Sequence, residues 1–307
     1  MPRSSLSLLD NKSLWKRHQI LNEIVKKGNK FSTTIDEFFD IKIELARRLM
    51  LSCSLCEKRC GVNRFSEGKG FCGVGEKSYY FAKSISYSEE LALIPSYTIY
   101  FNGCNFRCAY CNTRENSWLP SSGEEIDIEE LSTEILNRKE EIANVNFLGG
   151  EPTAHLLTIL LISRRLHGKM PIVWNSNMYC SCESIKLLEG VADIYLGDFK
   201  YGNDRCAMRY SGVENYSEIV KRNFLLAEKS ARLIIRHLLL PGHFECCFLP
   251  VIKWIEKNLP QIEFSLFSEY VPYPNMEGYE EIDRRISREE LDRARSFVKQ
   301  KGINLID

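Results

Sequence analysis

Three cysteines lie close together in the segment GCNFRCAYC, residues 103–111. The thiolates of Cys104, Cys108 and Cys111 can converge on one metal centre. A structural zinc ion normally has a fourth protein ligand, and this segment offers none. A [4Fe–4S] cluster usually takes four cysteines, so three would leave one iron free to bind a small molecule. The spacing therefore indicates an incompletely ligated iron–sulfur cluster, or a zinc knuckle that borrows a distant cysteine.

A second cysteine group precedes the first and has the spacing CxxC, three residues, C, eleven residues, C. Four thiolates would close a tetrahedral zinc site, and the same ligands could hold a second [4Fe–4S] cluster that relays electrons. Zinc is slightly favoured because the loops are short. Four free thiols are the remaining alternative. The ligands in this group, here called the knuckle, are Cys53, Cys56, Cys60 and Cys72.

Bulk composition narrows the class of protein. The chain has 307 residues, of which 44% are apolar, and its 41 basic residues balance 41 acidic ones. Nucleic acid is therefore not the expected partner. The first twenty residues contain no signal-like apolar run, and no stretch is long and apolar enough to span a membrane. We expect a cytoplasmic protein, in which disulfides are a weaker explanation of twelve cysteines than metal binding.

From about residue 97, short β-rich runs alternate with longer amphipathic segments, as in βα units around a parallel sheet. Asp127, Asn215 and Ser287, each followed three residues later by glutamate, predict capping boxes at three helix starts, and Gly302 could close the last helix. The predicted fold is α/β, a partial (β/α)6 TIM-like barrel whose site lies at the C-terminal mouth. The expected divisions are a helical extension at 1–50, the knuckle and a linker at 51–96, the barrel at 97–275, and a final helix and tail at 276–307. The expected strands are 97–101, 145–148, 171–174, 192–196, 233–238 and 263–267.

The CxxxCxxC pattern, with an aromatic residue before its last cysteine and a strand before it, resembles the radical S-adenosylmethionine (SAM) superfamily over roughly residues 97–270. The resemblance implies that the unligated iron chelates the amino and carboxylate groups of SAM. An electron, expected from flavodoxin or ferredoxin, then yields a 5′-deoxyadenosyl radical that abstracts hydrogen. By resemblance, Tyr110 packs near the adenine. Its alternative role is that of a core aromatic residue.

Further segments resemble cofactor contacts of the same superfamily. Gly149, Gly150 and Glu151 are similar to a motif that binds the methionine amino group. Asp198 and Lys200 resemble the Asp-x-Lys of glycyl radical enzyme-activating enzymes. That resemblance implies that Lys200 binds the methionine carboxylate, while Asp198 serves the cofactor or a nearby cation.

The ends of two more strands carry similar expectations. In the segment around residues 236–242, either Arg236 or His237 could reach the cofactor. Ser176 or Asn177 could contact the ribose. Asn175 stands where the activating enzymes carry an acid, so one negative ligand for a monovalent cation is missing here.

The whole span from the knuckle to residue 247 resembles the PflX-type group, radical SAM proteins similar to pyruvate formate-lyase-activating enzyme. The resemblance implies hydrogen abstraction from a protein or peptide, including glycyl radical installation. Modification of a small metabolite and a non-catalytic zinc-binding interaction protein are the alternatives. Three spare thiols follow strand ends, where substrate should lie, and our hypothesis is that one of them gives or accepts hydrogen. These thiols are Cys206, Cys246 and Cys247. Each considered alone could instead be a small apolar side chain that packs in the core.

Overall fold

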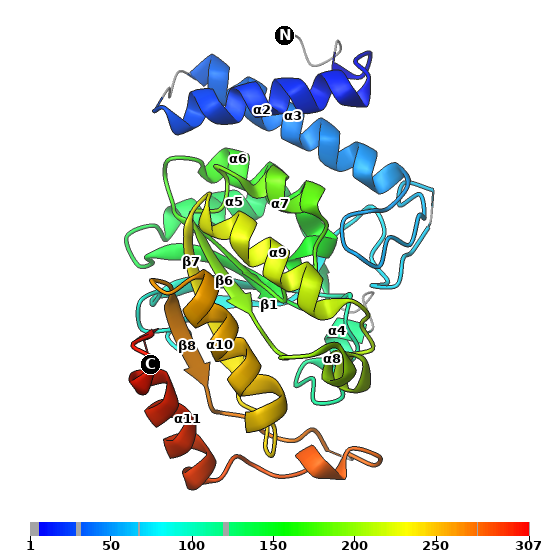
Figure 1. Cartoon of the computed structure of the whole chain (residues 1–307). Helices are drawn as coiled ribbons and strands as arrows, with labels where there is room; N and C mark the ends of the chain where they lie inside the picture. Colours follow the sequence, from blue (N-terminus) through cyan, green and yellow to red (C-terminus); the bar gives the residue numbers. More distant parts are fainter. Residues whose placement is uncertain (1–5, 29–31, 67, 119–122, 275, 307) are drawn as a thin grey trace.

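The structure is a computed structural model that describes residues 6–28, 32–66, 68–118, 123–274 and 276–306 (Figure 1). In this part of the chain, nine strands form one sheet in the order β3-β1-β2-β4-β5-β6-β7-β8-β9. Strands β2 and β4 to β9 pair in parallel, while β1 pairs antiparallel with both β2 and β3. The predicted α/β class with a mostly parallel sheet is therefore confirmed.

The six predicted strands all form, each within two residues of its expected ends. Their cores read as continuous apolar runs because helices cover the outer face of the sheet and the inner face is also enclosed. They are β2 (Ser96–Phe101), β4 (Asn144–Gly149), β5 (Ile172–Ser176), β6 (Ile194–Asp198), β7 (Arg232–Leu238) and β8 (Glu263–Phe267).

Three strands were not predicted. β1 (Tyr79–Ser86) lies in the segment assigned to the linker and pairs with β2. The two-residue strands β3 (Glu124–Glu125) and β9 (Asn304–Leu305) extend the two edges of the sheet. The sequence did not predict these strands because β1 lacks a continuous apolar run and the other two are too short to show a hydrophobic period.

Helices connect successive parallel strands, as crossover connections require. Those that join the barrel strands are α5 (Ile128–Asn137), η1 (Pro152–His155) with α6 (Leu156–Leu166), α7 (Cys182–Leu188), α8 (Asp204–Ser211), α9 (Tyr216–Glu228), and η2 (Phe244–Phe248) with α10 (Leu249–Asn258). The short helix α4 (Arg114–Trp118) follows the cysteine loop, and η3 (Glu280–Ile282) and α11 (Arg288–Gln300) precede β9.

Two of the three predicted helix caps form. Asp127 accepts a hydrogen bond from the Glu130 N–H, and Ser287 with Glu290 makes a complete capping box. The prediction for Asn215 is wrong, because this residue has a φ of 50° and makes no side-chain cap. The Oδ1 atom of Asp204 instead accepts from the Ser217 N–H at 2.8 Å.

An N-terminal pair of helices, α2 (Asn11–Lys26) and α3 (Ser32–Leu51), lies across the outer helices of the barrel (Figure 1). The Arg164 guanidinium in α6 donates to Asp36 and Asp40 in α3, both at 2.6 Å. Lys42 is fully buried, and its amino group donates to the backbone oxygens of Leu187 and Glu189 at the end of α7. Burial lowers the pKa of Lys42 well below its usual value, and these hydrogen bonds satisfy both the amino group and the last carbonyls of the helix.

The knuckle segment packs against the loop that follows β5. Cys56 forms an isolated antiparallel bridge with Cys180, and the Ser181 N–H donates to the Leu55 oxygen at 3.0 Å. The Glu57 N–H donates to the Tyr179 oxygen at 3.4 Å.

Among the described residues, none of the helices has the length and apolar content needed to cross a membrane.

Candidate functional site

The carboxyl ends of five neighbouring parallel strands meet around one cavity of about 230 Å³. Each strand delivers one of the predicted groups, because side chains that follow parallel strands gather at the same edge of the sheet. The residues that line the cavity include Cys104, Cys108, Tyr110, Cys111, Gly149, Gly150, Glu151, Asn175, Ser176, Asn177, Asp198, Lys200 and Arg236. Residues predicted from separate motifs, up to 132 positions apart along the chain, are thus brought together (Cys104 to Arg236).

The cysteine loop begins directly after β2, and hydrogen bonds to the end of α8 hold it in place. The Arg107 N–H donates to the Ser211 oxygen at 3.0 Å, and the Ala109 N–H donates to the Tyr210 oxygen at 2.8 Å. Cys108 Sγ lies 3.0 Å from the Ser211 hydroxyl. These bonds fix the loop backbone, so the thiols are positioned before any metal binds.

Two of the three thiols of the loop have a pKa that burial raises. Cys104 is buried, and burial raises the pKa of its thiol well above the usual value. Burial likewise raises the pKa of Cys108 to about 11. Binding a metal centre would therefore release protons from neutral thiols. Tyr110 is also buried, and its hydroxyl is hydrogen bonded to the Tyr201 hydroxyl at 2.7 Å.

The end of β4 approaches the cysteine loop too closely for any side chain at Gly150. A Cβ atom there would stand 2.7 Å from the Gly103 carbonyl carbon. The Gly150 N–H donates to the Phe101 oxygen at 2.7 Å and holds this contact. The two glycines of the motif therefore join the second strand end directly to the start of the cysteine loop.

Glu151 organises the ends of β4 and β5. It is 1% exposed, and its Oε1 accepts from the hydroxyls of Thr153 and Ser176 at 2.6 and 2.7 Å. Its Oε2 accepts from the Asn177 N–H at 3.0 Å. Burial raises the pKa of this carboxyl, although the hydrogen bonds oppose the shift. The Asn177 side chain donates to Asn105 at 2.7 Å, so it also ties this strand end to the cysteine loop.

A buried group of charges completes the cavity wall. Asp198 accepts from Lys200 Nζ at 2.6 Å and from Arg236 Nε at 2.7 Å. Burial alone would raise the pKa of Asp198, but the two cations outweigh it and lower the pKa to about 2. Lys200 is thereby held as an ammonium at the cavity. Because an ammonium has three donors, it can keep this bond and bind a further carboxylate.

Two acidic residues missed by sequence reasoning also reach this group. Glu89 and Glu90 lie in the loop between β1 and β2, and their carboxylates stand 3.8 and 3.6 Å from Arg236 Nη1. Asn175 Oδ1 accepts from Arg236 Nη2 at 2.8 Å. The sequence carried no signal for the two glutamates, because β1 itself was not predicted.

One predicted cofactor residue does not line the cavity. His237 is buried on the opposite face of β7, as the alternation of side chains along a strand requires. Its Nδ1 lies 2.6 Å from the Phe199 oxygen, and its ring packs against Phe248. Between the two candidates Arg236 and His237, the structure places Arg236 at the cavity.

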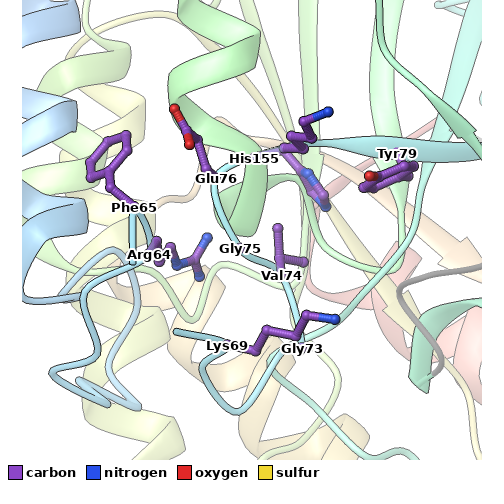
Figure 2. A pocket seen from close by; sticks show the side chains of 10 residues that line it. Arg64, Phe65, Lys69, Gly73, Val74, Gly75, Glu76, Tyr79 and His155 are labelled. Carbon is purple, nitrogen blue, oxygen red and sulfur yellow. The ribbon is translucent and has the colours of Figure 1, made fainter. Parts of the chain in front are cut away.

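The knuckle cysteines lie outside this cavity. Arg64 is buried beside them, and its guanidinium donates to Cys72 Sγ at 3.1 Å and to the Ala154 oxygen at 2.7 Å. A larger cavity of about 600 Å³ opens next to Arg64 and His155 (Figure 2). It contains none of the predicted cofactor residues, so its size does not make it the cofactor site.

The described residues contain one group of three or more His, Cys, Asp or Glu ligand atoms that all lie within 4.8 Å of one another, and it includes neither the cysteine loop nor the knuckle.

The comparisons with known proteins agree with this geometry. A family model, the radical SAM superfamily, matches residues 98–255. The uncharacterized protein MJ0674 of Methanocaldococcus jannaschii is 38% identical over 97% of this chain and 90% of its own length. The pyruvate formate-lyase 1-activating enzyme of Escherichia coli K12 is 25% identical, and the match spans 47% of this chain and 60% of that enzyme.

Among solved structures, Streptococcus suis SuiB bound to precursor peptide SuiA superposes with a TM-score of 0.50 at 13% identity. The match covers 66% of this chain and 46% of that chain, and it shows likeness of fold. The family match spans half of the chain and contains the cysteine loop, the glycine motif and the charged group. The chain is therefore a radical SAM enzyme, a member of the radical SAM superfamily, whose members use a [4Fe–4S] cluster and S-adenosylmethionine.

Proposed function

We propose that this enzyme reductively cleaves SAM at a cluster held by Cys104, Cys108 and Cys111, and abstracts hydrogen from a protein or peptide. The observation that carries the proposal is the single cavity shared by these thiols, the glycine motif and the buried charges. The cluster, when bound, would supply the electron that converts SAM to methionine and a 5′-deoxyadenosyl radical.

The chain's own residues would bind and orient the cofactor. Backbone carbonyl oxygens at Gly149 and Gly150 would accept hydrogen bonds from the methionine ammonium. The negative charge of Glu151 would favour the same group. Lys200 would bind the methionine carboxylate while Asp198 keeps its position. Tyr110, Ser176 and Asn177 line the same cavity and remain the proposed contacts to adenine and ribose. Arg236 would pair with Asp198 and help to keep its carboxylate charged.

An assay for 5′-deoxyadenosine after anaerobic reconstitution and dithionite reduction tests the chemistry. We expect the wild type to form 5′-deoxyadenosine and methionine in equal amounts. Cys108→Ala should lose the iron–sulfur absorption and the product together. Lys200→Met should keep the cluster but bind SAM at least tenfold more weakly, since one charge-assisted bond contributes about 1.5–3 kcal/mol. Cys182→Ser, outside the cavity, is the control. A wild type without SAM-dependent product would refute the proposal.

A polypeptide substrate is favoured by the similarity to an enzyme named for activating pyruvate formate-lyase. Installation of a glycyl radical is one form of this activity, and modification of a small metabolite is the competing proposal. Mass spectrometry and electron paramagnetic resonance of cell extract treated with reduced enzyme separate them. A backbone radical on one polypeptide supports the first, and a changed small molecule supports the second. A non-catalytic zinc protein does not agree with the family.

An acidic electron donor such as flavodoxin or ferredoxin has a suitable docking surface beside the cysteine loop. Phe71 is 40% exposed, and Lys58 Nζ and the Arg107 guanidinium each lie 4.4 Å from its ring centre. Basic groups around an exposed aromatic ring suit an anionic protein partner. Phe71→Ala should slow turnover driven by reduced flavodoxin and leave turnover driven by dithionite unchanged. An equal effect on both would refute this surface.

The knuckle is proposed to hold zinc or a second cluster at Cys53, Cys56, Cys60 and Cys72. The buried Arg64 beside Cys72 supports binding of thiolates, because a guanidinium favours their charged form. Iron and zinc analysis of the Cys53→Ala variant decides between the two metals. Loss of zinc identifies a structural ion, loss of iron identifies a cluster, and unchanged metal content refutes the site.

A further inference from the structure

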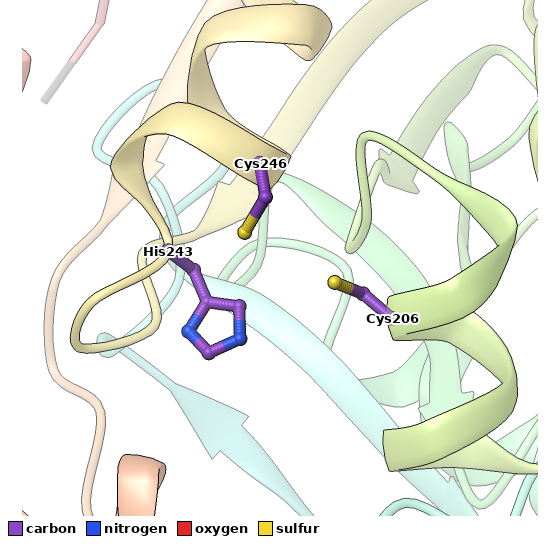
Figure 3. A group of neighbouring side chains, drawn as sticks. All are labelled: Cys206, His243 and Cys246. Atoms are coloured by element: carbon purple, nitrogen blue, oxygen red, sulfur yellow. The ribbon is translucent and has the colours of Figure 1, made fainter.

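We propose that Cys206, His243 and Cys246 bind a zinc-type divalent metal ion at the barrel mouth, separate from the cysteine loop and the knuckle. Their ligand atoms all lie within 4.8 Å of one another. In Figure 3 the two sulfur atoms and the imidazole ring point into one common space. Two thiolates and an imidazole form a ligand set that zinc prefers.

The geometry needs only a small contraction around an ion. Zinc binds sulfur at about 2.3 Å and imidazole nitrogen at about 2.0 Å, which places tetrahedral ligand atoms roughly 3.5–4 Å apart. The three side chains come from two loop–helix segments: Cys206 from the first turn of α8, which the loop after β6 enters, and His243 and Cys246 from the start of η2, which the loop after β7 enters. Neither segment could bind the ion alone.

The surroundings of the group are those of a prepared ligand site. His243 Nδ1 lies 2.7 Å from the Pro241 oxygen. A carbonyl can only accept, so Nδ1 carries the proton and Nε2 keeps its lone pair. Nε2 lies 3.0 Å from the Tyr210 hydroxyl, a contact that a bound ion would replace. The Asn203 amide donates to Cys206 Sγ at 3.3 Å and to the Cys246 oxygen at 2.6 Å. This one side chain therefore orients ligands from both loops.

The backbone is also shaped for this contact. Cys246 lies in η2, a single π-helical turn, and such turns occur frequently at functional sites. Gly202 allows the two loops to touch, because a Cβ atom there would lie 2.8 Å from Cys247 Cα. Two loops held this closely by a glycine and a shared asparagine keep the three ligands in place.

Three protein ligands leave a fourth position on the ion for water or for a donor atom of a bound molecule. Helix α8 carries Cys206 at its start and Ser211, which contacts Cys108, at its end. The ion would thus lie roughly one and a half helical turns from the cysteine loop. A substrate that offers a carboxylate, thiolate or imidazole could be anchored there, within reach of the cofactor cavity. Cys206 and Cys246 would then be metal ligands and not hydrogen donors.

The first test uses the metal content of full-length protein, reconstituted anaerobically with iron and sulfide and then given Zn²⁺. We expect the wild type to hold one equivalent of zinc more than the Cys206→Ser/Cys246→Ser double variant. Cys182→Ser serves as the matched control and should equal the wild type. Equal zinc in wild type and double variant would overturn the proposal. Loss of iron in place of zinc would also overturn it, because the thiols would then ligate a cluster.

A second measurement needs no variant, so misfolding cannot obscure it. X-ray absorption at the zinc edge of the wild type should show scattering from a coordinated imidazole. The knuckle offers only cysteines, so that signal can come from neither the knuckle nor the cysteine loop. A zinc spectrum with sulfur ligands alone would overturn the proposal. Both readouts are independent of radical chemistry, so their failure would leave the proposed function standing.

Discussion

Arg236 donates from Nη2 to Oδ1 of Asn175 at 2.8 Å, where a neutral amide takes the place expected for an acid. Across the cavity edge, the same guanidinium contacts Asp198, Glu89 and Glu90. The loop between β1 and β2 thus supplies negative charge directly beside Asn175, whose Nδ2 lies 3.4 Å from Glu89 Oε2. Lys200 and Arg236 supply two positive charges against the three acids, and burial raises the pKa of Glu89, so one bound proton would make the group neutral without a further cation.

The first prediction concerns that amide. The wild type should form 5′-deoxyadenosine at the same rate in potassium, sodium and tetramethylammonium buffers. Asn175→Asp places a new carboxylate near Glu89, whose Oε2 lies 3.4 Å from Asn175 Nδ2, and should make the rate depend on a small monovalent cation. A wild-type rate that falls when potassium is removed would show that the cation site persists despite Asn175.

The second prediction concerns the buried charges. Asp198→Asn leaves Lys200 and Arg236 without their shared anion in a buried position, and should lower the free energy of unfolding by about 3–5 kcal/mol. The matched control is Asp36→Asn. Asp36 also pairs with an arginine, at 2.6 Å, but its side chain is 60% exposed, so the loss should stay below about 1 kcal/mol. Anaerobic urea unfolding measures both, and equal losses would contradict the prediction.

The third prediction concerns the contact between two strand ends. Gly150→Ala should push the cysteine loop away through the Gly103 carbonyl and reduce bound iron and SAM affinity together. Gly168→Ala is the control, since its Cβ meets nothing within 4 Å. Its φ of 69° still makes the change cost about 1 kcal/mol in stability. Iron analysis and SAM titration compare the two, and full iron with normal SAM binding in Gly150→Ala would be evidence against the close approach.

The fourth prediction concerns acid stability. Burial lowers the pKa of His155 from its usual 6.5 to about 3. Below pH 6.5 the unfolded chain takes up a proton that the folded chain refuses, so stability is lost as the pH falls toward 3, by about 1.4 kcal/mol per pH unit. Between pH 7.5 and 5.5 the wild type should therefore lose about 1.4 kcal/mol more than His155→Gln. Urea unfolding at the two pH values measures this difference, and parallel losses would show that His155 does not titrate in this way.

The barrel strands could be predicted because each is an apolar run between helical segments, and the capping pairs at Asp127 and Ser287 behave as isolated local motifs. Asn215 failed as a cap because its backbone is left-handed, a conformation that asparagine adopts more readily than most residues. A neighbouring acid, Asp204, satisfies the helix start in its place.

In the candidate site, the cysteine loop and the glycine motif could be found because their residues are adjacent in sequence. The choice between Arg236 and His237 required the register of β7, since neighbours on a strand face opposite sides. Glu89 and Glu90 required a strand that has no strong pattern. The grouping of Cys206 with His243 required two loops to meet, and no spacing in a single segment encodes such a meeting.

The isolated backbone β-bridge between Cys56 and Cys180 has a practical consequence for purification of this enzyme. In the segment that leaves β5, the Tyr179 backbone oxygen accepts both from the Glu57 N–H of the knuckle segment and from the Asn105 side chain of the cysteine loop. If air or a chelator strips the knuckle of its proposed metal, that segment loses one of its two supports. A preparation could then contain a complete cluster and still bind SAM poorly, with the damage located outside the cofactor cavity.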